Sequence, residues 1–186
     1  MRRAAPRVAL PPSHPPHTFT PLLAALSTDN AKFGAQRVAQ IVPQMKETGL
    51  AHGIAFSYGG EVGNTFDSHR LISWAAKQGG VAKADELMEH LFRRYFEQEQ
   101  NLASHAVLAA AAGEAGLSAE GAAEFLATDA ESAEVRAEMR GMRARHQVGG
   151  VPYFIIGEKI AFSGAQDAEA IVDCFERVLE EEEEQG

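Results

Sequence analysis

The sequence predicts an α/β fold that is mostly helical, with a block of consecutive helices ahead of a closing β-β-α unit. Apolar residues recur at helical spacing through most of residues 33–145. After Gly149-Gly150 the pattern changes to two short apolar runs joined by a glycine-containing turn, which is typical of a β-hairpin. A last helix follows, and its apolar stripe is formed by Ile171, Cys174, Phe175 and Val178.

The first helix is expected over residues 33–47, because apolar side chains recur there at helical spacing. Pro43 lies within this stretch and predicts a kink, and Gly49 predicts the end of the helix. Residues 52–58 are partly apolar and indicate a loop or an extended piece. The proline-rich residues ahead of the helix predict an extended, mobile segment over residues 1–28.

Further helices are expected between residues 64 and 145. Asn64 has the character of an N-cap, with Asp67 three positions on, and Gly79-Gly80 ends the helix that follows. The remaining helices are expected over residues 82–99, from Ser104 to Gly113 or Gly116, from Ser118 to about Ala127, and from Thr128 to about Arg145, where Thr128 and Glu131 form a capping-box pattern.

The closing unit is expected over residues 149–180, with strands at 153–156 and 160–162. Pro152 comes directly before the first strand, a position that suits a residue without a backbone N–H. A proline there can also adopt the cis peptide, which only X-Pro bonds reach at low cost. Ser163 and Gln166 have the spacing of a capping box for the last helix.

Composition limits the classes of function. The 186 residues fit one domain or one domain with an insertion, and an apolar fraction of 45% is enough for a core. The net charge of −9 argues against nonspecific nucleic-acid binding, which requires a basic surface. No run of about 18 apolar residues occurs, so no membrane span is expected. The seven histidines show no ligand spacing, so no metal site is expected.

Cys174 is the single cysteine, so no disulfide can form within the chain, which suits a reducing, cytoplasmic compartment. The lack of acidic residues before Asp29 favours organelle import, but the prolines there disfavour the amphipathic helix that import requires. Five glutamates, Glu180 to Glu184, are expected to be solvated and frayed, as part of an acidic tail over residues 181–186.

Three motifs, in the expected order, resemble the DsbA-like thioredoxin superfamily: residues 64–71, 150–154 and 163–166. The chain looks most similar to the FrnE-type branch, which is related to 2-hydroxychromene-2-carboxylate isomerases and kappa-class glutathione transferases. The resemblance covers roughly residues 30–180. It implies a thioredoxin-like fold interrupted by a large helical domain, here residues 29–148, and completed by the β-β-α part at 149–180.

The resemblance also implies where a ligand would bind. Pro152 corresponds to the family's cis-proline, and the backbone of Val151 would then pair with an extended peptide or with glutathione. Ser163, Gly164, Ala165 and Gln166 lie where relatives hold the γ-glutamyl end of glutathione, at a helix N-terminus that suits a carboxylate. Asn64 could meet a polar group of the ligand, although an N-cap role explains it without one.

The family's opening β-α-β unit is not recognisable here. In relatives it carries a C-x-x-C pair, or a serine in the glutathione-using branches, whereas this chain has proline-rich sequence there and no C-x-x-C. Cys174 is far in sequence from the position of that dithiol, and its apolar stripe predicts burial rather than the exposure a reactive thiol needs. His69 has no acid or cysteine partner in the sequence, so it is expected to be packed or solvated, and no catalytic residue is assigned.

Three hypotheses follow. In the first, the chain is a member of the thiol-disulfide oxidoreductase family that is inactive as this chain, because it is truncated and an upstream reading frame encodes the C-x-x-C. In the second, it is a non-catalytic module that binds a peptide, a thiol substrate or glutathione, and forms a homodimer through an open sheet edge. The third is a glutathione-dependent isomerase or transferase.

Overall fold

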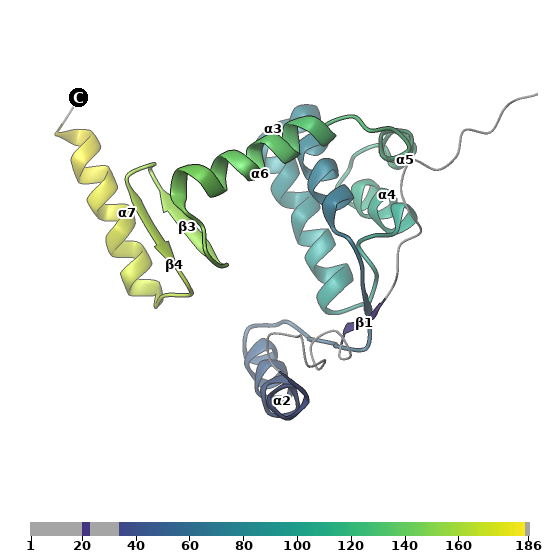
Figure 1. Cartoon of the computed structure of the whole chain (residues 1–186), viewed down its shortest axis with the longest axis horizontal. Helices are drawn as coiled ribbons and strands as arrows, with labels where there is room; N and C mark the ends of the chain where they lie inside the picture. The colour runs from purple at the N-terminus through teal and green to yellow at the C-terminus, as the bar shows by residue number, and fades with distance from the viewer. Residues whose placement is uncertain (1–19, 23–33, 185–186) are drawn as a thin grey trace, which may run out of the picture. The chain divides into compact units, whose positions relative to one another are not determined.

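The computed structural model describes residues 20–22 and 34–184. Contacts within the chain divide it into two compact units, Met1–Glu131 and Ser132–Gly186. Figure 1 shows the elements of each unit along the chain. Most of the proline-rich segment expected over residues 1–28 lies outside the described residues.

The first unit contains β1 (Thr20–Pro21), α2 (Ala35–Ala51), β2 (Glu61–Val62), α3 (Phe66–Phe96), α4 (His105–Glu114) and α5 (Ala119–Leu126). The second contains α6 (Ser132–His146), β3 (Tyr153–Ile156), β4 (Ile160–Ser163) and α7 (Ala168–Glu183). Strands β1 and β2 pair antiparallel, and so do β3 and β4. The β1–β2 pair was not predicted, because two-residue strands leave no periodicity to detect.

The core of the first unit lies among α3, α4 and α5. Leucine side chains from all three helices are buried there, and the alanine-rich face of α4 lets its backbone come close to its neighbours. The partly buried Trp74 stacks on Phe125, with ring centroids 5.6 Å apart, at the edge of this core. The buried leucines are Leu71, Leu87, Leu91, Leu108 and Leu126.

Helix α3 is broken at the glycine pair, as the sequence predicts. Gly79 and Gly80 have non-helical backbone angles, and Gly80 adopts φ 77° and ψ −174°. This region is essentially restricted to glycine, since a side chain there would clash with its own backbone. The pair therefore sets the change of direction between the two helical halves of α3.

Of three helix starts expected from the sequence, two are confirmed and one is wrong. The Ser104 hydroxyl accepts from the Val107 N–H and the Ser118 hydroxyl from the Gly121 N–H, which confirms both predicted caps. The capping box predicted from Thr128 is wrong. Helix α6 begins at Ser132, and the Glu131 carboxylate instead accepts from Ser73 and Lys77.

Helix α2 runs through Pro43 and ends at Ala51, so the predicted end at Gly49 is wrong by about half a turn. The Gly49 carbonyl accepts from the N–H groups of His52 and Ile54, which closes the helix just after the glycine. A side chain at Gly49 would overlap the Phe56 ring, so this residue is needed for close packing.

In the second unit, β3 and β4 form the predicted hairpin, with Phe154 opposite Phe162 and Ile156 opposite Ile160. The phenyl rings of Phe154 and Phe162 stack, with centroids 5.0 Å apart. Figure 1 shows the hairpin between α7 and the C-terminal end of α6, where the Tyr153 hydroxyl donates to the His146 carbonyl.

Two expectations for the last helix are corrected. Its N-cap is Asp167, and Ser163 is the last residue of β4, so the predicted Ser163–Gln166 capping box does not form. The glutamate run expected to be frayed is helical as far as Glu183, although its side chains are exposed. Among the described residues, no helix is long and apolar enough to cross a membrane.

Replacing Gly80 tests the break in α3. We expect Gly80→Ala to destabilise this helix by about 1–3 kcal/mol, because the cost comes from the backbone alone: a Cβ there meets nothing within 4 Å. Gly141→Ala, inside α6, is the matched control and should stabilise its helix by about 0.5–1 kcal/mol. Hydrogen exchange of α3 and α6 amides measures both effects, and a neutral Gly80→Ala would contradict the expectation.

Candidate functional site

The strand β3 has an open backbone edge. The Gly164 N–H donates to the Pro152 carbonyl at 2.9 Å, and the register then gives Phe154 and Ile156 the hydrogen bonds within the hairpin. Backbone groups of alternate residues point to opposite edges, so those of Tyr153 and Ile155 point away from β4. Among the described residues β3 pairs with no strand other than β4.

The predicted docking residues stand at the beginning of this edge. The Val151–Pro152 peptide bond is cis, as the sequence predicts. Val151 is 81% exposed, which leaves its side chain and the chain around it accessible from solvent. Val151 and Pro152 therefore lie directly before the outward-facing backbone groups of β3.

Two of the residues predicted to hold glutathione lie beside the start of β3. Ser163 lies opposite Tyr153, and Gly164, with φ 86°, is bonded to Pro152. Ala165 and Gln166 follow in an exposed loop. The N-cap of α7 is Asp167, whose side chain makes no capping hydrogen bond. Its carboxylate therefore lies at the helix N-terminus where the anionic end of glutathione was expected to bind.

Asn64 belongs to the first unit. Its side-chain oxygen accepts from the Phe66 N–H at 2.9 Å, an Asx turn one residue ahead of the N-cap Thr65. The expectation that Asn64 is itself the N-cap is therefore wrong by one position, but its side chain does have a structural role at the start of α3.

A charged cluster in the first unit was not predicted. The Asp67 carboxylate, 5% exposed, accepts from Arg70 at 2.8 Å and lies 2.7 Å from the His105 ring nitrogen. Arg70 is fully buried and also donates to the carbonyls of Thr128 and Ala130. The three-residue spacing of Asp67 and Arg70 is readable in the sequence, but the long-range partners are not.

Two opposing effects set the pKa of Asp67. Burial raises the pKa of the carboxyl, while hydrogen bonds from His105 and Arg70 and their positive charge lower it. The lowering effects dominate, so the pKa of Asp67 lies below its ordinary value of 3.8. The carboxylate is therefore ionised at neutral pH, in keeping with a structural ion pair.

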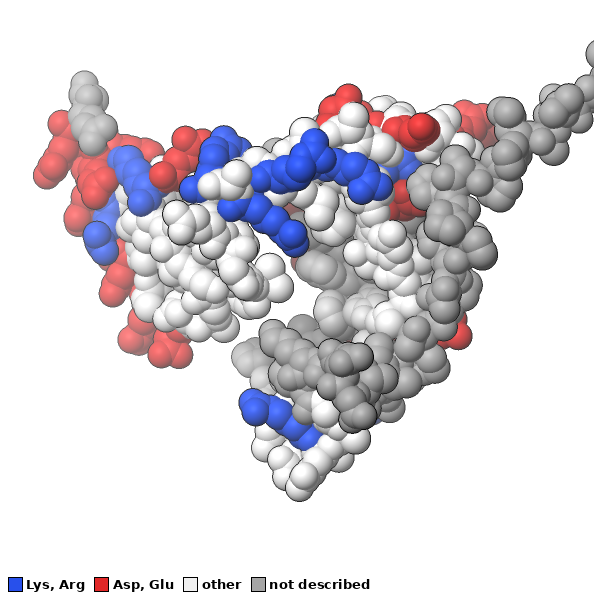
Figure 2. Space-filling view, viewed as in Figure 1, with Lys and Arg blue, Asp and Glu red and all other residues white. Residues whose placement is uncertain are grey.

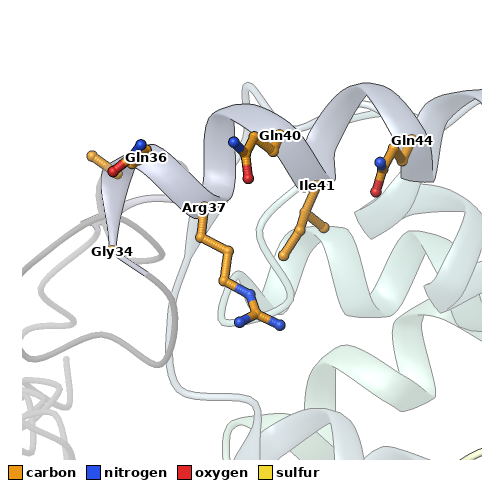
Figure 3. Close-up of a pocket in the computed structure, with 7 residues that line it drawn as sticks. Gly34, Gln36, Arg37, Gln40, Ile41 and Gln44 are labelled. Carbon is orange, nitrogen blue, oxygen red and sulfur yellow. The ribbon is translucent and has the colours of Figure 1, made fainter.

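The other candidate residues do not converge on a reactive centre. His69 is exposed, and Cys174 is partly buried on α7. The described part of the chain contains no group of three or more histidine, cysteine, aspartate or glutamate side chains placed to hold a metal ion. The described residues that line a hollow of about 740 Å³ come from α2 and its N-cap Gly34, as Figure 3 shows for Arg37, Gln40 and Ile41.

The two strands of the hairpin carry no charged side chain, although charged residues flank them. Figure 2 shows lysine and arginine along α6 and aspartate and glutamate around α7, with uncharged residues over the hairpin. Strands β3 and β4 contain no charged side chain. Edge strands that avoid pairing usually carry such charges, so this edge is suited to accept a further strand.

Comparison with known proteins agrees with this geometry. The family described as DSBA-like thioredoxin domain matches residues 19–176. Among solved structures, the chain is similar to a probable DsbA oxidoreductase from Streptomyces coelicolor, with 28% sequence identity and a TM-score of 0.79. That match covers 91% of this chain and 72% of the other. Comparison with curated proteins gives no match.

The Asp67 cluster predicts a pH dependence of stability. Folding lowers the pKa of Asp67, so this carboxylate stabilises the folded state fully at a pH above its unfolded pKa, near 3.9. That stabilisation is lost as the pH falls through the pKa of the folded state. We expect Asp67→Asn to lose about 3–5 kcal/mol at pH 7, and its difference from wild type to shrink below about pH 4. Urea unfolding between pH 7 and pH 2 measures this; Asp129→Asn, an exposed neighbour of the cluster, is the control.

Parallel pH curves for Asp67→Asn and wild type would show that the carboxylate does not carry this pH dependence.

Proposed function

Because the chain belongs to the DsbA-like thioredoxin family of oxidoreductases, we propose that it holds extended polypeptide substrates along the open edge of β3. The observation that carries this proposal is the outward direction of the Tyr153 and Ile155 backbone groups. An extended peptide added to a sheet edge is bound mainly through its main chain. Such binding tolerates many sequences, which is what an acceptor of varied unfolded substrates requires.

The surroundings of the edge favour a neutral, extended occupant. No charged side chain stands on either strand to repel an incoming backbone. Val151 lies exposed at the start of the edge and offers an apolar contact beside the main-chain groups. In the family the residue before the cis-proline is the docking residue, and Val151 occupies that position.

We further propose that these 186 residues bind such substrates without exchanging their disulfides by themselves. Exchange begins with a thiolate that attacks one sulfur of a disulfide, which forms a mixed disulfide and releases the other sulfur as a thiolate. A second thiol, from the same protein or from a small molecule, must then attack the mixed disulfide to release the product. Cys174 is the single cysteine, so the chain supplies no resolving thiol, and it stands on α7 rather than at a helix N-terminus.

Glutathione and a second copy of the chain are the alternative occupants of the same edge. Glutathione is a short extended peptide and could use the same backbone groups. A second copy could pair strand to strand, because an open edge is also a template for self-association. Both are separated from substrate binding by the competition described below.

The binding proposal is tested with reduced, S-carboxymethylated insulin B chain, an extended polypeptide with blocked thiols. Ile155→Pro removes an outward N–H, whereas Ile155→Ala removes a similar side chain and keeps that N–H. We expect Ile155→Pro to weaken binding about 2- to 10-fold relative to Ile155→Ala, the equivalent of one net hydrogen bond. Isothermal titration calorimetry measures the affinities, and equal affinities would exclude the β3 edge.

The competing occupants are excluded by two controls in the same samples. Sedimentation velocity at several protein concentrations detects pairing between copies of the chain. Titration of glutathione into the bound complex shows whether it displaces the peptide. Amide resonances of Tyr153 and Ile155 that shift with peptide, and are unaffected by glutathione, would support substrate docking.

Absence of turnover is the second expectation from this proposal. We expect no catalysed reduction of insulin by dithiothreitol in the presence of the chain. Dithiothreitol could resolve a mixed disulfide, but Cys174 is partly buried on α7 and does not stand at a helix N-terminus, where a reactive thiolate is favoured. Cys174→Ser should behave like wild type in both turbidity and peptide-binding assays. Turnover that disappears in Cys174→Ser would overturn the proposal.

A further inference from the structure

An aromatic cavity lies in the first unit, and its walls are held by hydrogen bonds. The loop 53–59 is tied to the end of α3: the Ser57 N–H donates to the Phe96 carbonyl at 2.7 Å, and the Ala55 N–H donates to the Glu97 carboxylate at 3.3 Å. The Gly59 N–H and the Ser57 hydroxyl both donate to Glu99. The loop therefore has a fixed position on the last turns of α3.

The wall opposite α3 is fixed as well. Helix α2 ends against this loop through the Gly49 carbonyl, which accepts from the Ile54 N–H at 2.8 Å. The Phe56 ring packs where a side chain at Gly49 would stand, and it meets Phe96 edge to face with centroids 5.6 Å apart. Three separate segments thus enclose one space, which is the arrangement expected of a preformed ligand pocket.

The cavity has a volume of about 530 Å³, which suits a small organic molecule. Large apolar side chains that line it remain open to solvent, including Phe92 at 48% and Phe96 at 37% exposure. Its residues are Met45, Gly53, Ile54, Phe56, Tyr58, Glu89, Phe92, Arg93, Phe96 and Glu97.

The four aromatic rings are inclined to one another rather than stacked in parallel. Phe56 and Phe96 meet at 80°, Phe92 and Phe96 at 51°, and Phe56 and Tyr58 at 42°. All four residues line the cavity. The face of each ring carries the negative part of the ring quadrupole, so such a group of rings attracts a cation.

The charged side chains that line the cavity also favour a positively charged ligand. Glu89 and Arg93 on α3 and its C-cap Glu97 follow one another at four-residue spacing and line the cavity together. Among the described residues of the lining, two carboxylates and one guanidinium leave one net negative charge beside the aromatic rings. A single positive charge on the ligand would match that excess, whereas an anion would meet repulsion from both glutamates.

We propose that this cavity binds a small monocationic molecule in which the charge is carried by an apolar ammonium group. The methyl or methylene groups around the nitrogen would contact the phenyl rings, and Glu89 would balance the charge. The described residues that line this site belong to the first unit, whereas β3 belongs to the second.

The test uses a pair of probes that differ in charge but not in shape. Choline carries a trimethylammonium group, and 3,3-dimethyl-1-butanol replaces its nitrogen by carbon. Benzyltrimethylammonium adds a ring that fills more of the cavity, and benzoate supplies the opposite charge for Arg93. Chemical-shift titration of residues 53–58 and 92–97 reports binding at this site.

We expect choline to bind about 3- to 30-fold more tightly than its neutral isostere, and benzyltrimethylammonium more tightly than benzoate. Equal binding of choline and 3,3-dimethyl-1-butanol, tighter binding of benzoate, or no shifts at this site with either cation would overturn the proposal.

Matched variants locate the interaction. Phe92→Ala should weaken benzyltrimethylammonium binding about 3- to 30-fold, whereas Phe175→Ala on α7, of similar exposure at 51%, should leave it unchanged. Glu89→Gln should reduce the preference for choline over its isostere, and the exposed Glu120→Gln on α5 should not.

Circular dichroism confirms that each variant folds. Equal effects of Phe92→Ala and Phe175→Ala, or an unchanged preference in Glu89→Gln, would contradict the site. Ile155→Pro, designed for the β3 edge, should not alter cation binding.

Discussion

The first unit depends on the hydrogen bonds and the ion pair that the buried guanidinium of Arg70 makes. This guanidinium donates to Asp67, to the Thr128 carbonyl and to the Ala130 carbonyl, and it lies 5.1 Å over the Phe125 ring. Through Asp67 the same network reaches His105, the first residue of α4. One charged group therefore joins α3, α4 and the segment after α5. Burying it is costly, and its hydrogen bonds and ion pair offset that cost.

The described residues of the second unit contain no equivalent network of buried charges. In the part of this unit that the structure describes, the sheet has two strands, and Val135, Ile156 and Val178 are the large apolar side chains that are buried. Val172, Phe175 and Leu179 are exposed on α7. A two-stranded sheet is marginally stable by itself, so added strands and apolar cover would stabilise it. Among the described residues the outer edge of β3 has no partner strand, and this is the edge that we propose holds a substrate.

The sequence predicts features that depend on neighbouring residues. The Ser104 and Ser118 caps, the break at Gly79-Gly80 and the β3–β4 hairpin follow from local chemistry, and the position of Val151 and Pro152 follows from a motif. The sequence predictions failed where a side chain binds a partner that is distant in sequence. Glu131 is bound by Ser73 and Lys77, more than 50 residues away, instead of completing a capping box. The aromatic cavity was missed for the same reason, since Phe56 and Phe96 lie 40 residues apart in sequence.

The two proposed binding places differ in how they would select a partner. The β3 edge offers main-chain hydrogen bonds, which every extended peptide can satisfy, so it would discriminate weakly among sequences. The cavity offers inclined aromatic rings and, among the described residues of its lining, one excess negative charge, so it would select by shape and charge. Neither place requires a reactive sulfur. With Cys174 partly buried on α7 and no second thiol to resolve a mixed disulfide, binding is the chemistry that the described geometry favours for these 186 residues.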